Sequence, residues 1–218
     1  MDFKKIFARK ISRERLEPFI RKNLTDEKTL DLGCGNSPYS KYFPNRIGCD
    51  IERSKNVDIV GDAHELPIKD NVFHSVLATE VLEHVKNPQK VIDEVRRVLK
   101  PNGKLILTTR FIFPLHDTPN DYYRYTKYGL GYLLREWDIV EIKEETDTME
   151  SLAILFQRIS IQCNILNFKP LKVFLHFIAY IAKHLGFMIK KEYGAENVPE
   201  KNIMTSGYYV IAFNRKKI

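Results

Sequence analysis

The chain has 218 residues, of which 44% are hydrophobic and 29% are charged, values typical of a soluble protein with one sizeable core. Its cysteines are odd in number and lack metal-type spacing, which argues against a disulfide framework and favours a reducing, cytoplasmic location (Cys34, Cys49, Cys163). The first ten residues are basic, but no apolar run follows them, so a secretory signal is not expected.

The net charge of +7 arises in two segments. Residues 1–22 carry eight Lys and Arg against three acids, residues 169–191 carry five Lys and no acid, and the remainder sums to −3. Two solvated helix faces would explain this pattern. A surface for an anionic partner, either a membrane or a nucleic acid, would explain it equally well. We expect no DNA partner, and only the charge favours RNA.

In chain order, the patterns predict a basic helix within residues 1–24 and then short apolar strands that alternate with helices. Helices are expected at 88–99 and 126–137, and PNGK at 101–104 has the composition of a turn. The strands are expected at 29–33, 46–51, 57–62, 74–80, 104–109, 137–145 and 207–215. This alternation predicts an α/β fold with a doubly wound, mostly parallel, seven-stranded sheet that binds ligands at the carboxyl ends of its strands.

An apolar helical insertion at about 150–200 interrupts this rhythm. Within 171–189, 14 of 19 residues are apolar. On a helical wheel the basic positions form one narrow stripe, which predicts a helix lying in a membrane interface with its Lys heads at the headgroups (Lys172, His176, Lys183, Lys190). The same positions argue against a spanning helix. A cap packed on the sheet and a dimer interface are the alternatives.

The stretch LDLGCG at 30–35 ends the first predicted strand in a glycine loop. Glycines let the backbone turn sharply and approach a ligand closely. The third glycine of a dinucleotide-binding fingerprint would fall at position 38, which is Pro, and no Lys-Ser/Thr pair follows, which excludes a P-loop.

Carboxylates end the next two predicted strands. Asp50 lies fifteen residues after Gly35, where it can accept hydrogen bonds from both hydroxyls of a ribose. Asp62 can accept from an exocyclic amine, and the N–H of Ala63 can donate to a ring nitrogen. Together these groups predict a site for an adenine nucleoside.

With VLEHV at 81–85, these motifs resemble the class I S-adenosylmethionine-dependent methyltransferases of small molecules over about residues 25–145. The pattern departs at His74, where Asp is usual, and at Asn102, where Gly is usual. The resemblance implies a Rossmann-like domain over 25–218, with a core of 25–150 and 201–218 and an antiparallel last strand. It implies S-adenosylmethionine as cofactor, S-adenosylhomocysteine as product, and a cofactor-binding set of Asp31, Gly33, Cys34, Gly35, Asp50, Ile51, Asp62, Ala63 and Glu80.

The run Glu80-x-x-Glu83-His84 places three ligand-type side chains close together, and His116 follows the fifth predicted strand. The set is similar to a metal motif of some ubiquinone-pathway and small-RNA methyltransferases. Many relatives with the same LEHV string are not known for metal, so a structural or substrate-facing role is favoured and no metal site is assigned.

The loops after the first four strands are assigned to the cofactor. We therefore expect the polar stretch at 114–126, PLHDTPNDYYRYT, to contact the molecule that accepts the methyl group. We expect His116 and Asp117 to act as a base and its orienter, Tyr122 to form a wall, and Arg124 to clamp an anionic acceptor. Alternatively, Asp121 caps a turn and pairs with Arg124. The string resembles one in methyltransferases of glycan assembly.

These inferences predict a methyltransferase that acts on an oxygen of a small molecule or of a sugar, with a lipid-linked sugar as one form of the acceptor. The insertion at 150–200 and the segment 1–22 would then meet the inner face of a membrane. The alternatives are a quinone-type lipid methyltransferase, a non-catalytic cofactor-binding protein and an RNA-directed enzyme. No NPPY-like run follows the fourth strand, which argues against methylation of a nucleobase amine.

Overall fold

The computed structural model describes residues 11–162, 169–185 and 204–215. The predictions for residues 1–10, for Cys163 and for Lys190 lie outside the described residues. The chain forms two compact units. We call them the sheet unit, comprising Phe19–Phe111, Leu115–Lys143 and Tyr208–Ile218, and the helical unit, comprising Met1–Pro18, Ile112–Pro114 and Glu144–Gly207.

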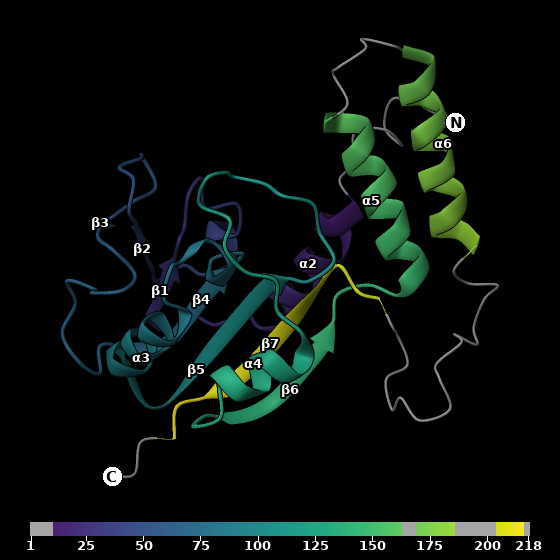
Figure 1. The fold of residues 1–218 in the computed structure, drawn as a ribbon. Coiled ribbons are helices and arrows are strands. Elements are labelled where there is room, and N and C mark those ends of the chain that lie inside the picture. The colour runs from purple at the N-terminus through teal and green to yellow at the C-terminus, as the bar shows by residue number, and fades with distance from the viewer. Residues whose placement is uncertain (1–10, 163–168, 186–203, 216–218) are drawn as a thin grey trace. The chain divides into compact units, whose positions relative to one another are not determined.

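The sheet has seven strands in the order β3-β2-β1-β4-β5-β7-β6 (Figure 1). β1 pairs in parallel with β2 and β4, β2 with β3, and β4 with β5. The strand order reverses between β1 and β4, so the loops after these strands diverge and leave a crevice at their carboxyl ends. The strands are β1 Thr29–Leu32, β2 Arg46–Asp50, β3 Ile59–Val60, β4 Phe73–Thr79, β5 Leu99–Arg110, β6 Asp138–Glu144 and β7 Gly207–Phe213.

The last strand, β7, runs antiparallel to β5. Asn214, just after β7, exchanges backbone hydrogen bonds with Asn102 and Gly103 near the start of β5, whereas Thr205, just before β7, accepts one from Ile112 beyond the end of β5. The predicted fold class, a mostly parallel sheet with an antiparallel last strand, is therefore confirmed.

The predicted turn at PNGK is instead part of β5. Phe73 pairs with Leu99 and Ser75 with Lys104, so β5 has extra residues between two pairs and bulges there. Asn102 adopts a φ of +58° in this bulge. The turn-forming residues thus bend a strand without ending it, because the pairing resumes directly after them.

Two helices cover the sheet and build its main core. α3, Pro88–Val98, buries Val91, Ile92, Val95 and Val98 at the predicted helical spacing. α4, Lys127–Leu133, is shorter than the predicted 126–137, and Leu134 is its C-cap. Thr126 caps its start by accepting a hydrogen bond from Gly129 N at 3.0 Å. Two single-turn 3-10 helices, η1 at Ser40–Tyr42 and η2 at Leu82–His84, complete the elements of the sheet unit.

The helical unit is built on α5, Thr148–Gln162, and α6, Lys169–Leu185, which lie side by side (Figure 1). The first part of α2, Ile11–Lys22, also belongs to it, up to Pro18. Small side chains let these helices approach closely. The buried cluster consists of Ile11, Phe113, Ala153, Ile154, Ala179 and Ala182.

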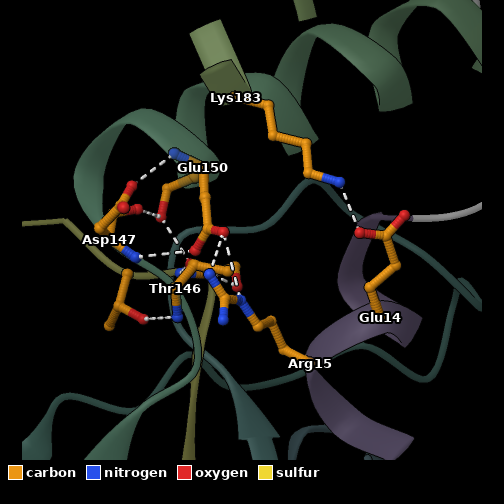
Figure 2. A network of polar contacts seen from close by, with 9 residues as sticks. Glu14, Arg15, Thr146, Asp147, Glu150 and Lys183 are labelled. Carbon is orange, nitrogen blue, oxygen red and sulfur yellow. Dashed lines mark hydrogen bonds and ion pairs between the residues drawn. The ribbon is translucent and has the colours of Figure 1, made fainter. Parts of the chain in front are cut away.

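Polar contacts fix the orientation of α6 in this unit. Figure 2 shows Lys183 of α6 paired with Glu14 of α2, and Arg15 of α2 paired with Glu150 of α5. His176 of α6 lies with its Nδ1 2.6 Å from Ser160 Oγ of α5. The predicted polar stripe of α6 therefore faces the neighbouring helices at His176 and Lys183.

The exposed residues of α6 are mainly apolar, although Lys172 and His184 are exposed as well. Val173, Phe174, Phe177 and Ile181 are between 38% and 60% exposed. The expectation of outward-facing Lys183 and His176 heads is corrected, because helical periodicity gives their angular positions but not which side faces inward. Among the described residues, no helix has the length and hydropathy needed to cross a membrane.

Substitution of Asn87 tests whether its side chain caps and stabilises α3. Its side chain caps α3 by accepting a hydrogen bond from Lys90 N at 3.1 Å. Replacement of Asn87 by Ala should lower the free energy of unfolding by about 1 kcal/mol, because a backbone N–H loses its partner. Urea denaturation measures the loss. Asn87→Ser should recover most of it, and equal stability of Asn87→Ala and the native chain would contradict the cap.

Candidate functional site

A cavity of about 490 Å³ lies at the carboxyl ends of β1, β2 and β4, entirely within the sheet unit. This volume is in the range of small-molecule and cofactor sites. Loops from five segments of the chain build its wall. The lining residues are Leu32, Gly33, Asp50, Ile51, Gly61, Asp62, Ala63, His64, Glu80, Val81, His84, Val85, Lys86, Asn120 and Tyr122.

The glycine loop after β1 approaches the loop after β4 very closely. Gly33 has a φ of +63°, and its N–H donates to Cys49 O at 2.8 Å. A Cβ at this position would lie 2.6 Å from Val81 Cγ2. Glycine is required here by both its conformation and this contact, and the result is a bare backbone edge beside the cavity.

Asp50 at the end of β2 is held by backbone donors. Its Oδ2 accepts from Gly35 N at 2.8 Å and its Oδ1 accepts from Glu52 N at 3.1 Å. Each carboxylate oxygen has a further lone pair, so the group can still accept from a ligand hydroxyl. Ile51, which also lines the cavity, is 67% exposed and offers an apolar surface.

Asp62 is oriented by His64, two residues later. Its Oδ1 accepts from His64 N at 2.8 Å and from His64 Nδ1 at 2.6 Å. These hydrogen bonds, the backbone one first, lower the pKa of the Asp62 carboxyl. Asp62 is therefore a carboxylate at neutral pH, with Oδ2 available to a donor, and Ala63 beside it also lines the cavity.

Three residues of the predicted cofactor set are not among the lining residues: Asp31, Cys34 and Gly35. Asp31 is buried, and its Oδ2 accepts from Ser37 Oγ at 2.8 Å and from Arg46 Nε at 3.2 Å. Burial raises the pKa of its carboxyl, while Ser37 and Arg46 act in the opposite direction. Gly35 contributes through the hydrogen bond of its N–H to Asp50. These contacts brace the loop that carries Gly33.

The other side of the site is the stretch His116–Thr126, which is pinned to η2. The carbonyl of Glu83 accepts from Tyr122 N at 2.8 Å and from Tyr123 N at 3.2 Å. Tyr125 Oη donates to Leu82 O at 2.9 Å, and burial raises the pKa of the Tyr125 phenol above its ordinary value. Tyr122 is held at the cavity wall by these bonds.

Two glutamates at the end of β4 have different surroundings. Glu80 lines the cavity, has a φ of +57° and pairs with the buried Arg110. Glu83 is fully buried, and its Oε2 accepts from Thr109 Oγ1 at 2.8 Å. Burial raises the pKa of Glu83 to about 6, against the hydrogen bonds and Arg110, which lower it.

His84 and His116 lie together at this end of the cavity. Their ring centroids are 4.7 Å apart with an interplanar angle of 77°. His84 Nδ1 donates to Asn120 O at 2.7 Å. The carboxylate beside His116 is that of Asp121, whose Oδ2 accepts from His116 N at 3.0 Å and lies 3.5 Å from His116 Nδ1.

Of the four predicted catalytic residues, one lines the cavity and three do not. Tyr122 lines the cavity, and His116 stands behind it against His84. Asp117 is exposed, has a φ of +52° and lies nearest to His84, at 4.0 Å from its Nε2. Arg124 donates two hydrogen bonds to Asp121, from Nη1 at 2.6 Å and from Nη2 at 2.7 Å, which is the alternative that the sequence left open.

Several lining residues were missed by the sequence reasoning. His64 could have been found from its position two residues after Asp62, where a side chain can bond back to a strand-end carboxylate. His84 was named only as part of a metal alternative. Val81, Lys86 and Asn120 give no signal in the sequence, because the loop after β5 brings Asn120 to them only in the folded chain.

Residues 30–107 match the family model described as a methyltransferase domain. This segment is similar to methyltransferase domains. An uncharacterized protein from Methanocaldococcus jannaschii is 38% identical over 113 residues, which cover 46% of this chain and 49% of that protein. The demethylmenaquinone methyltransferase of Paenarthrobacter aurescens is 33% identical over 95 residues, covering 37% of this chain and 38% of that protein. The chain thus spans half or less of the length of these relatives.

Solved structures show the same fold. The [4+2]-cyclase SpnF has a TM-score of 0.59 at 18% identity, covering 92% of this chain and 80% of that one. Phosphoethanolamine N-methyltransferase 2 of Haemonchus contortus, in complex with S-adenosyl-L-methionine, has a TM-score of 0.58 at 17% identity, covering 94% and 53%. At these identities the similarity establishes the Rossmann-like fold and not a reaction.

The thiol of Cys34 behind the cavity should be unreactive. Burial, reinforced by the nearby carboxylates of Asp31 and Asp50, raises its pKa to about 11. At pH 9 about one such thiol in a hundred is ionised, and the thiolate is the nucleophile. Alkylation by iodoacetamide at pH 9 should therefore be at least about fiftyfold slower in the native chain than in urea, and should accelerate as the pH rises towards 11. Peptide mass spectrometry isolates Cys34, and equal rates in both states would contradict its burial.

Proposed function

We propose that this chain is an S-adenosylmethionine-dependent methyltransferase that methylates an oxygen of a small molecule or of a sugar. The observation that supports it most is the arrangement at one cavity of Gly33, Asp50 and Asp62, at the carboxyl ends of successive parallel strands. The match of residues 30–107 to a methyltransferase domain and the neighbour that binds the cofactor support the same conclusion.

The residues present fit this cofactor. Asp50 would accept from the ribose hydroxyls through the lone pairs that the backbone leaves available. Asp62 Oδ2 would accept from the adenine amine, with the Ala63 N–H beside it. The bare backbone at Gly33, where a Cβ would collide with Val81, admits the methionine part. When bound, S-adenosylmethionine supplies a methyl group already activated by a sulfonium, so the chain must mainly orient the acceptor and exclude water.

The acceptor would meet the wall formed by Tyr122, His84 and Asn120. A hydroxyl acceptor loses a proton on methylation, and imidazoles at this wall can help to remove it. Quinone-type C-methylation remains the second candidate, because relatives named for that reaction match 37% and 48% of this chain. A non-catalytic cofactor-binding protein and an RNA-directed enzyme are weaker alternatives.

Substitution of Asp50 tests cofactor binding. Asp50→Ala should weaken binding of S-adenosylhomocysteine by about ten- to hundredfold, because a charge-assisted hydrogen-bond acceptor is lost. Titration calorimetry measures the affinity. Asp93→Ala, which removes an exposed carboxylate on α3, should bind normally.

Turnover is then measured with labelled S-adenosylmethionine and cell extracts. Label in the lipid fraction supports a lipid-linked sugar or a quinone as acceptor. If the labelled lipid is stable to alkali and releases a labelled methylated sugar in acid, the acceptor is a lipid-linked sugar. Binding without turnover in any extract favours the non-catalytic alternative. If the native chain does not bind S-adenosylhomocysteine, every methyltransferase function proposed here is rejected.

We further propose that the exposed face of α6 contacts an anionic membrane surface. Val173, Phe174, Phe177 and Ile181 are apolar and exposed on one side of the helix. The segment 169–191 carries five Lys and no acid, and apart from Lys183, which pairs with Glu14, these charges complement anionic headgroups. The inward-facing Lys183 leaves the apolar residues to insert, so the contact differs from the one that the sequence predicted.

Vesicle flotation tests this contact. The double variant Phe174→Glu/Phe177→Glu should reduce co-flotation with anionic vesicles by at least about tenfold, because two exposed aromatic side chains that would insert into the membrane are replaced by charges. Tyr128→Glu/Tyr132→Glu, which alters two exposed aromatics on α4, should float like the native chain. A native chain that does not float, or a double variant that loses only self-association in sedimentation, would overturn the membrane proposal in favour of a second copy of the chain.

A further inference from the structure

The carboxylate of Glu83 and the rings of His84 and His116 form a cluster at one end of the cavity. One ligand atom from each residue lies within 4.8 Å of the other two. We propose that these three residues bind a divalent transition-metal ion. Bonds of 2.0–2.2 Å to one ion would draw the ligand atoms to about 3.4 Å from one another, a change that small side-chain rotations provide.

Glu83 is the strongest support for this site. It is fully buried, and Thr109 satisfies only Oε2. Its Oε1 has no hydrogen-bond partner among the described residues. A buried carboxylate oxygen without a partner is costly in free energy. A cation shared with His84 and His116 would remove that cost, whereas a purely structural role for Glu83 leaves it in place.

The two imidazoles are oriented as metal ligands. His84 Nδ1 donates to Asn120 O at 2.7 Å, which makes Nε2 the basic nitrogen. His116 Nδ1 lies 3.5 Å from Asp121 Oδ2, so a hydrogen on Nδ1 faces a carboxylate. Carboxylates and carbonyls of this kind commonly hold the outer nitrogen of a ligating histidine and fix its tautomer. Arg124, in turn, holds Asp121 through two hydrogen bonds.

The donor set indicates the class of metal. Two imidazoles and one carboxylate suit Zn²⁺, Fe²⁺ or Co²⁺, whereas Mg²⁺ and Ca²⁺ prefer sites made of oxygen alone. Three protein ligands leave a coordination position for water or substrate, as in catalytic zinc sites. Glu80 is not one of the ligands, because its carboxylate pairs with Arg110.

The position of the cluster suggests its role. His84 lines the cavity on the side of Tyr122 and Asn120, where the acceptor is expected. A hydroxyl bound to the open position would be oriented and acidified, and its proton would pass to water and not to an imidazole, because both rings would be occupied as ligands. This role rests on the proposed methyltransferase function, but metal binding itself does not.

Metal binding is tested on the untagged full chain after removal of metals by a chelator. Titration with Co²⁺ should produce a visible absorption band that saturates at one ion per chain, and Zn²⁺ should displace it. His84→Ala and His116→Ala should each weaken Co²⁺ binding by at least about hundredfold, because each removes one of three ligands. His184→Ala, which removes an exposed histidine of α6, should bind like the native chain.

The variant Glu83→Gln tests whether weaker Co²⁺ binding could result from unfolding and not from loss of a ligand. It keeps the shape of the side chain and an oxygen for Thr109, so its circular dichroism should be native while its Co²⁺ affinity falls by at least about tenfold. No saturable band, or equal Co²⁺ affinity in the native chain and the His84 and His116 variants, would overturn the proposal.

Affinity for S-adenosylhomocysteine is measured on the same samples. Retained affinity together with no Co²⁺ binding rejects the metal site alone. Co²⁺ binding without affinity for S-adenosylhomocysteine rejects the proposed function and leaves the metal site standing.

Discussion

The backbone carbonyl of Glu83 accepts hydrogen bonds from Tyr122 N and Tyr123 N, and the side of the cavity formed by Asn120 and Tyr122 depends on this contact. Its side chain is held at the same time by Thr109 of β5. One residue therefore ties the loop after β4 to both β5 and the loop that follows β5. Without these bonds nothing in the local sequence of His116–Thr126 would place Tyr122 and Asn120 beside His84, because Pro and Asp residues favour loops of many shapes.

The cavity exists because backbone conformations that are uncommon elsewhere are concentrated around it. Gly33 and Glu80 both have positive φ, at the ends of β1 and β4. The two strands are adjacent and parallel, so both loops open at the same edge of the sheet. Glycine adopts such a conformation freely, but Glu80 does so at a cost in free energy. The pairing of Glu80 with the buried Arg110 offsets part of that cost and keeps its side chain at the cavity wall.

Much of the fold was predictable because it depends on local periodicity. The apolar spacing of α3 and the buried runs of β1 and β4 each identify an element with no knowledge of its neighbours. The errors occur where tertiary contacts decide. PNGK bulges within β5 because β4 continues beside it, and the polar stripe of α6 turns inward because Glu14 and Ser160 offer partners. At the site, the same limit applies to His116, whose neighbouring carboxylate is Asp121 and not the adjacent Asp117.

The family model matches one side of the cavity and not the other. The segment that matches the methyltransferase domain ends at residue 107, before Arg110 and the whole stretch His116–Thr126. The residues proposed to hold the cofactor lie inside the matched segment, whereas two of the three residues of the proposed acceptor wall, Asn120 and Tyr122, lie beyond it. Glu83 and His84 are inside the matched segment and His116 is outside it, so the proposed metal ligands come from both parts of the chain. A change in the loop after β5 would move His116 relative to Glu83 and leave Gly33, Asp50 and Asp62 in place, so under the proposed function we expect this loop to set acceptor specificity.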